Sequence, residues 1–201
     1  MNATMRGVSI FAGVLIAIAA IALGVQFLGH GGAREPAYYG SRLEPPKAAT
    51  DAVLTNAYGR PDHVLGALFP TTFLFFGYTH CPDECPLALA SLAKAFRGLP
   101  LSAQARTRIV FVTVDPARDT APVMRRYLDR FGAPITGLTG TEAQLAPVWK
   151  AYGVEVDSKS REIGHGDAIY AIDSTQRVVL IYTPDTPSSE LRADASQLAE
   201  K

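Results

Sequence analysis

The sequence predicts an α/β fold, with a central mixed sheet flanked by helices, attached to an N-terminal transmembrane anchor. Three observations lead to this prediction. Residues 8–28 carry no charged side chain, short apolar runs alternate with helical periodicities in the rest of the chain, and a hairpin pattern comes near the end. Lysine plus arginine (19) balance aspartate plus glutamate (19), and no basic run is interleaved with aromatic residues, so nucleic-acid binding is not expected.

The apolar run at residues 8–28 predicts a retained membrane anchor. At about 1.5 Å per residue, a helix of this length crosses a bilayer core of about 30 Å. Arg6 and the N-terminal amine precede the run, which favours a cytoplasmic segment at residues 1–7 and an exported C-terminal domain. A cleaved signal peptide, with a small-residue site at residues 20–22, is the alternative, but its apolar region would exceed the usual length.

The rest of the chain divides into a linker and one globular domain. Residues 29–50 are rich in Gly, Pro and Ala and show no apolar period, which predicts a flexible tether. Residues 51–201 are enough for a single α/β core. Strands are predicted at residues 53–58, 72–76, 109–114, 168–172 and 178–182, the last two as a hairpin.

Apolar residues at helical spacing predict the helices between and after these strands. Their apolar faces are Leu89, Leu92, Ala93 and Phe96, then Met124, Tyr127, Leu128 and Phe131, then Leu145, Val148, Trp149 and Tyr152, with a last helix at residues 189–200. Thr120 is a candidate N-cap with Pro122 in the first turn, whereas Pro147 is expected to bend or shorten its helix. This order predicts a central parallel pair of strands with the hairpin at one edge, as in a thioredoxin-like sheet.

The only two cysteines, Cys81 and Cys85, lie between the strand that ends in Gly77 and the helical pattern that follows Pro86. A turn entering a helix favours thiolates, because unpaired backbone N–H groups and the helix dipole stabilise negative sulfur. Thioredoxin-like oxidoreductases use Cys-x-x-Cys, whereas this chain has one residue more between the sulfurs, which suits a chelate at least as well. A structural zinc site requires four ligands, but copper(I) accepts fewer and softer ones. A structural disulfide or two idle thiols remain the alternative.

Four segments resemble the Sco/SenC family in order and spacing, over about residues 54–182. They are FGYTHCPDECP at residues 76–86, VTVDPARDT at 112–120, GLTGT at 137–141, and His165 ahead of AIYAID at 168–173. The resemblance implies a thioredoxin-like domain on a single membrane anchor that delivers copper to the CuA centre of cytochrome c oxidase. It also implies that Cys81, Cys85 and His165 hold the copper ion. The family usually has Asp-His-Ser where this chain has Gly-His-Gly at residues 164–166.

Four polar residues near the motif each have a functional and a structural interpretation. Asp83, between the sulfurs, could act at the site, by accepting backbone hydrogen bonds of the turn or by lending an oxygen to copper(II). The structural interpretation is that Asp83 is simply a turn residue. Asp115 and Asp119 form either a charged shell near the cysteines or a helix cap and an ion pair. His80, next to Cys81, is a candidate ligand, but a side chain beside a ligand in a tight turn often points away.

The resemblance therefore predicts a metallochaperone rather than an enzyme, on the periplasmic side of a bacterial inner membrane. The expected partners are the oxidase subunit that carries CuA, a thiol-disulfide reductase that keeps the cysteines reduced, and another periplasmic copper carrier. A disulfide between Cys81 and Cys85 would be the inactive form, because it cannot bind metal as thiolate. A thiol-disulfide oxidoreductase, or a redox or copper sensor, is the alternative; an oxidoreductase would have no use for His165.

Overall fold

The computed structural model describes residues 37–66, 69–156, 163–164 and 168–200. The chain divides into two compact units, Met1–Ala37 and Tyr38–Lys201, and the second contains the sheet and its helices. Within the described residues, no helix is long and apolar enough to cross a membrane. The predicted anchor at residues 8–28 and the cytoplasmic segment at residues 1–7 lie outside the described residues.

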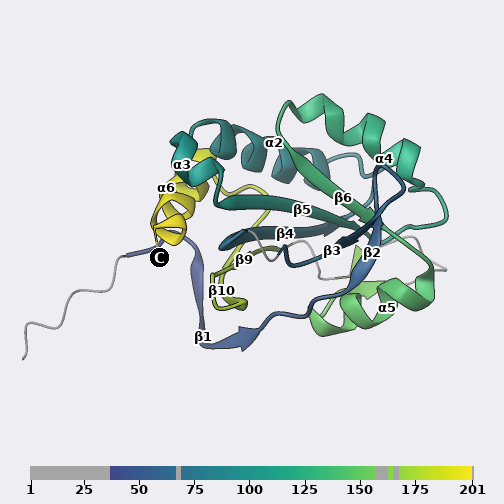
Figure 1. Ribbon diagram of the computed structural model, residues 1–201, viewed down its shortest axis with the longest axis horizontal. Coiled ribbons are helices and arrows are strands. Elements are labelled where there is room, and N and C mark those ends of the chain that lie inside the picture. Colours follow the sequence, from purple (N-terminus) through teal and green to yellow (C-terminus); the bar gives the residue numbers. More distant parts are fainter. Residues whose placement is uncertain (1–36, 67–68, 157–162, 165–167, 201) are drawn as a thin grey trace, which may run out of the picture. The chain divides into compact units, whose positions relative to one another are not determined.

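The domain is built on an eight-stranded mixed sheet with the order β1-β10-β9-β4-β5-β6-β2-β3 (Figure 1). The strands are β1 (Ser41–Ala48), β2 (Val53–Asn56), β3 (Pro61–His63), β4 (Thr71–Gly77), β5 (Thr107–Thr113), β6 (Ile135–Thr139), β9 (Ile169–Ile172) and β10 (Arg177–Tyr182). Strand β4 runs parallel to β5, and β5 parallel to β6, while the other neighbouring pairs are antiparallel. The predicted central parallel pair is confirmed. Two short strands, β7 (Glu155–Val156) and β8 (Ile163–Gly164), form a separate ladder.

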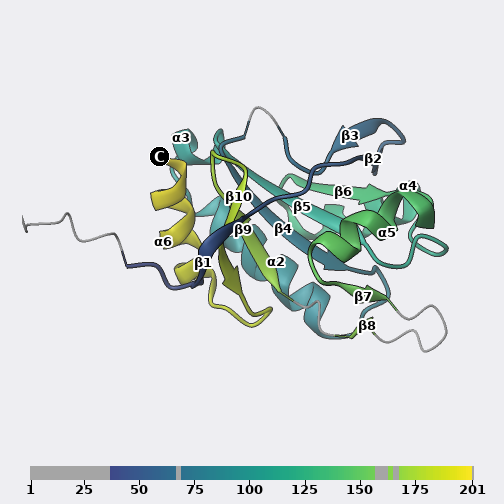
Figure 2. The same cartoon turned by 90° about the horizontal axis from the view of Figure 1, so that it is seen from below.

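Helices cover both faces of the sheet. They are α2 (Glu84–Arg97), α3 (Leu101–Gln104), α4 (Ala121–Leu128), the short 3-10 helix η1 (Asp129–Phe131), α5 (Glu142–Ala151) and α6 (Ser188–Ala199). Alternate residues of β4 point to opposite faces, as in any strand. Phe73 and Phe75 pack in the core under α2, α4 and α6, whereas Leu74 and Phe76 pack in the core under α5. Figures 1 and 2 show α2 and α5 on opposite sides of the strands.

Strand β1 corrects the predicted linker at residues 29–50. Residues 41–48 pair with β10, so the hairpin of β9 and β10 does not end the sheet. The buried carboxylate of Asp194 fixes the start of this segment by accepting hydrogen bonds from the backbone N–H groups of Tyr39 (3.0 Å) and Gly40 (2.9 Å) and from the Tyr182 hydroxyl (3.0 Å). The sequence did not predict this strand because it contains two prolines, Pro45 and Pro46, which disfavour strands. These prolines lie where the register of β1 shifts, and an edge strand tolerates proline at such an irregularity.

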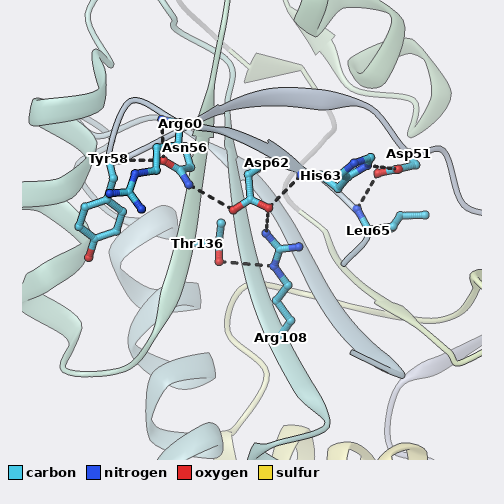
Figure 3. Close-up of polar contacts among 9 residues, drawn as sticks. All are labelled: Asp51, Asn56, Tyr58, Arg60, Asp62, His63, Leu65, Arg108 and Thr136. Atoms are coloured by element: carbon cyan, nitrogen blue, oxygen red, sulfur yellow. Dashed lines mark hydrogen bonds and ion pairs between the residues drawn. The ribbon is translucent and has the colours of Figure 1, made fainter. Parts of the chain in front are cut away.

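Polar contacts fix the β2–β3 hairpin to strands β5 and β6 (Figure 3). Asp62 Oδ1 accepts a hydrogen bond from Arg108 Nη2 at 2.9 Å, and Arg108 Nε donates to Thr136 Oγ1 at 3.4 Å. The Arg108 side chain is almost fully buried and that of Asp62 is partly exposed, so this ion pair joins β3 to β5 at the margin of the core. Nearby, His63 Nδ1 lies 2.6 Å from Asp51 Oδ2.

Most predicted elements are confirmed, but β3, β6, β7, β8 and α3 were not predicted. Strand β6 contains Gly137, a residue that disfavours strands. The structure explains the glycine, because a Cβ at position 137 would lie 2.5 Å from Leu128 Cδ1 and 2.9 Å from Met124 Cε. Helix α4 can therefore pack closely on β6. Thr120 occupies the N-cap position of α4 as predicted, although its side chain makes no capping hydrogen bond with the described residues.

Candidate metal centre

The two cysteines lie where β4 is followed by α2, as predicted. Cys81 is on the loop and is partly exposed, whereas Cys85 is in the first turn of α2 and only 3% exposed. The backbone N–H of Cys85 donates to Cys81 Sγ at 3.4 Å, and neither cysteine is in a disulfide. A backbone donor of the first helical turn thus faces the sulfur of Cys81, the contact that stabilises a thiolate.

Gly77, the last residue of β4, makes room for the inner sulfur. A Cβ at this position would lie 2.7 Å from Cys85 Sγ and 2.8 Å from Phe111 Cε2, both well inside van der Waals contact. Cys85 is packed in the same apolar cluster as Phe75 and Phe111. Any side chain at position 77 would therefore displace the sulfur or the ring.

A buried carboxylate fixes the loop that carries Cys81. Asp119 is 0% exposed and accepts three hydrogen bonds, from Thr79 N (3.0 Å), Thr79 Oγ1 (2.6 Å) and Thr113 Oγ1 (2.6 Å). Thr79 precedes the cysteine turn and Thr113 ends β5, so Asp119 joins the loop after β4 to the neighbouring strand. These contacts are neither a helix cap nor an ion pair, and a charged shell around the cysteines stays a prediction for Asp119.

Asp115 and His80 have different surroundings from Asp119. Asp115 forms an ion pair with Arg118, as the second interpretation expected. His80 has a half-exposed side chain, with Nδ1 3.0 Å from Thr79 Oγ1 and 3.8 Å from Asp119 Oδ1. The ring of His80 is thus held through its Nδ1 edge beside the buried carboxylate.

Two tyrosines near the sulfurs were assigned only to the core from the sequence. Burial raises the pKa of Tyr78. The nearby Cys81 and Cys85, and a hydrogen bond with the Cys81 side chain, raise this pKa further. Burial likewise raises the pKa of Tyr127, with further contributions from Cys85 and then Cys81. The Tyr127 hydroxyl has no hydrogen-bond partner among the described residues. For Tyr78, its place three residues before Cys81 was the available signal; for Tyr127 there was none, since it lies on another helix.

Asp83 takes the N-cap position of α2 and is exposed, and its side chain makes no capping hydrogen bond to the described residues. The expected ligand His165 lies outside the described residues. Among the residues that are described, no group of three or more His, Cys, Asp or Glu side chains is placed to hold a metal ion. Two neighbouring thiols at a helix N-terminus are nevertheless a donor set that fits a soft ion such as copper(I) better than a hard one.

Comparisons with known proteins agree with this architecture. The SCO1/SenC family model matches residues 54–200. The mitochondrial SCO2 homologue of Bos taurus is 36% identical over 118 residues, which are 56% of this chain and 41% of that protein. The match therefore spans about two fifths of the length of this curated relative.

Solved structures of Sco proteins share the fold. Apo Sco1 of Thermus thermophilus superposes with a TM-score of 0.70 at 32% identity, over 83% of this chain and 99% of that one. Copper-bound ScoI of Bradyrhizobium japonicum superposes with a TM-score of 0.63 at 30% identity, over 75% of this chain and 99% of that one. Since the family model covers almost all of the folded domain and two Sco structures match it nearly end to end, the chain belongs to the SCO1/SenC family.

Proposed function

We propose that this protein is a membrane-tethered copper chaperone that delivers copper to the CuA centre of cytochrome c oxidase during its assembly. The observation that carries the proposal is the pair of reduced thiols on one turn, one partly exposed and one buried, at the N-terminus of α2. Cys81, Cys85 and His165 are the proposed ligands of the copper ion. Thiolate and imidazole donors are suited to copper(I), and the imidazole also to copper(II).

The relatives support this assignment. A Bradyrhizobium japonicum protein of the same fold has been solved with copper bound. BsSco, which has this fold at 15% identity, is a member of the Sco family of cytochrome c oxidase assembly proteins. The proposed partners are the CuA-bearing oxidase subunit, a thiol-disulfide reductase and another periplasmic copper carrier.

The proposed transfer proceeds by ligand exchange with a partner's cysteines. Three ligands are replaced one at a time, so the copper ion is never released into solution. Oxidation of Cys81 and Cys85 to a disulfide would remove both thiolates, so a thiol reductant must restore them before copper can bind. In this scheme, the role of the fold is to hold the turn in place, which Asp119 does through Thr79 and Thr113.

The membrane tether is proposed from the sequence. Residues 8–28 would anchor the protein in a bacterial inner membrane, with the domain on the periplasmic side. The full protein should then stay with membranes through high-salt and alkaline washing and keep its N-terminus. Recovery in the soluble fraction with a mature N-terminus near residue 23 would show cleavage instead.

The second candidate is a thiol-disulfide oxidoreductase, and the unequal exposure of the two sulfurs favours it. The exposed Cys81 would attack a partner's disulfide, and the buried Cys85 would then resolve the mixed disulfide. As the pair is oxidised to a disulfide, the partner's disulfide is reduced to two thiols. This activity needs no third ligand, so His165 distinguishes the two candidates.

Copper titration of the reduced full chain tests the proposal. The wild type should bind one copper(I) per chain, Cys81→Ser and Cys85→Ser should lose most of the binding, and His165→Ala should weaken it, more for copper(II) than for copper(I). The matched control is His63→Ala, which removes an imidazole from β3 and leaves the proposed ligands in place. Full copper binding after loss of both cysteines would refute the assignment, and full oxidase assembly by His165→Ala at limiting copper would favour the reductase.

A further inference from the structure

We propose, building on the copper-carrying function above, that His80 is a transient copper ligand which passes the ion between a partner and the cysteine pair. Asp119 positions His80 for this role through Thr79. A chain of hydrogen bonds leads from the fully buried Asp119 carboxylate to the half-exposed imidazole of His80, the residue that precedes Cys81.

The hydrogen-bond chain fixes which nitrogen of His80 carries the proton. Thr79 Oγ1 donates its single proton to Asp119 Oδ1, at 2.6 Å. The same oxygen lies 3.0 Å from His80 Nδ1. Because a hydroxyl has only one proton to give, His80 Nδ1 must be the donor in this second bond. Its N–H also faces Asp119 Oδ1, 3.8 Å away.

With Nδ1 protonated, the neutral ring presents the lone pair of Nε2. The His80 side chain is 54% exposed, and no hydrogen bond or ion pair joins Nε2 to the described residues. A histidine that binds metal almost always donates its other ring N–H to a carboxylate, carbonyl or water, which fixes its tautomer and orientation. His80 has this support already, through Thr79, beside a proposed ligand.

The role is a transient one because the described residues contain no preformed three-ligand group that includes His80 and both cysteines. Cys81 is the more exposed cysteine, whereas Cys85 is buried in the core. An ion that arrives from a partner therefore meets His80 and Cys81 before Cys85. Copper(I) first exchanges its bonds to the partner's ligands for bonds to Nε2 and to Cys81 sulfur, and the Cys81 thiol proton leaves to solvent. The bond between copper and Nε2 then breaks as the bond to Cys85 sulfur forms, the Cys85 thiol proton leaves to solvent, and copper(I) keeps its oxidation state.

The test measures copper(I) equilibrium and kinetics separately on the reduced full chain. Affinity and stoichiometry come from competition with a chromophoric copper(I) chelator, and the rates of uptake and release come from stopped-flow mixing with the same chelator. His80→Ala should slow uptake and release together, by about tenfold, which is the low end for loss of a supporting metal-site contact. Since both directions slow equally, the affinity should change less than about twofold, as an equilibrium constant is the ratio of the two rates.

Three further variants separate the imidazole from its surroundings. Thr79→Val, which removes the hydroxyl but keeps His80, should also slow transfer, and Thr79→Ser should restore it. His63→Ala, an exposed histidine on β3, is the control for loss of an imidazole elsewhere. Alkylation of Cys81 by iodoacetamide should proceed at the wild-type rate in His80→Ala, because the proposed role involves copper and not the thiol proton.

Each result decides for or against His80 as a transient ligand. Wild-type transfer rates in His80→Ala overturn it, and so does a loss of affinity in proportion to the slower uptake, which would make His80 an equilibrium ligand. Slower alkylation in step with slower copper transfer would assign His80 to proton transfer and also overturn it. If the wild type itself binds no copper, the proposed function fails, which the wild-type stoichiometry reveals independently of any variant.

Discussion

Replacement of Asp119 by asparagine should destabilise the domain and loosen the cysteine turn. Both carboxylate oxygens accept hydrogen bonds, Oδ1 from the Thr79 amide and hydroxyl and Oδ2 from the Thr79 amide and the Thr113 hydroxyl. An amide keeps one accepting oxygen, so its NH2 group must face at least one of these donors. An unmet buried donor costs about 1–3 kcal/mol, and Thr113 is fully buried, so we expect the free energy of unfolding to fall by about 2 kcal/mol.

The assay is urea denaturation of the reduced protein, with hydrogen exchange at the Thr79 amide as a local measure. Asp115→Asn is the matched control, because Asp115 pairs with Arg118 at the partly exposed surface, where an ion pair contributes about 0–1 kcal/mol. The Thr79 amide should exchange faster than in the wild type in Asp119→Asn, and at the wild-type rate in Asp115→Asn. If Asp119→Asn unfolds within about 0.5 kcal/mol of wild type, the buried carboxylate does not hold the turn as argued.

Three further predictions concern the inner sulfur, the first strand and alkaline pH. Gly77→Ala should cost about 1–3 kcal/mol in urea denaturation, because its Cβ meets Cys85 Sγ and Phe111. At position 98 a Cβ meets the flexible side chain of Arg192 and lies 3.4 Å from Ala95 O, so Gly98→Ala should cost less; equal effects would contradict the packing argument. A chain that begins at residue 51 should be less stable than one that begins at residue 38, because it lacks β1 and leaves β10 paired on one edge alone, with β9; equal melting temperatures would show that β1 is dispensable. Burial raises the pKa of Tyr152 to about 12 from the usual 10.0, so its share of the stability is full below pH 10 and is lost as the pH rises toward 12. Tyr152→Phe should therefore flatten the fall in unfolding free energy over this range, and an unchanged slope would refute the attribution.

The sequence predicted those features of the site that depend on neighbouring residues. The apolar run before Gly77 and the helical pattern after Pro86 placed both cysteines on a turn entering a helix, because strand and helix periodicities are local properties. The central strands and the helices α2, α4, α5 and α6 followed from the same periodicities.

Features that depend on strand pairing could not be predicted in the same way. Thr79 and Asp119 are far apart in sequence, and their contact exists only because β4 pairs in parallel with β5. The glycine in β6 lowers the local strand preference, but it serves the packing of α4, which no local pattern records. Likewise, β1 is an exposed edge strand with prolines at its irregularity, so its composition is that of a linker.

The unequal exposure of the two cysteines connects the chaperone and reductase candidates physically. Both activities need one sulfur that a partner can reach and a second sulfur close enough to complete the exchange, and Cys81 and Cys85 meet this need in either case. What differs is whether an imidazole takes part, because disulfide exchange requires sulfur alone whereas copper transfer gains from a further soft or borderline ligand. Asp119, through Thr79, holds Nδ1 of the half-exposed His80, the residue before Cys81, and leaves Nε2 without a hydrogen-bond partner among the described residues. A neighbouring imidazole can serve either activity, as a ligand that passes copper on or as a group that activates the Cys81 thiol. The two candidates therefore differ in what loss of the His80 imidazole changes, which is the rate of copper transfer in one and the rate of thiol alkylation in the other.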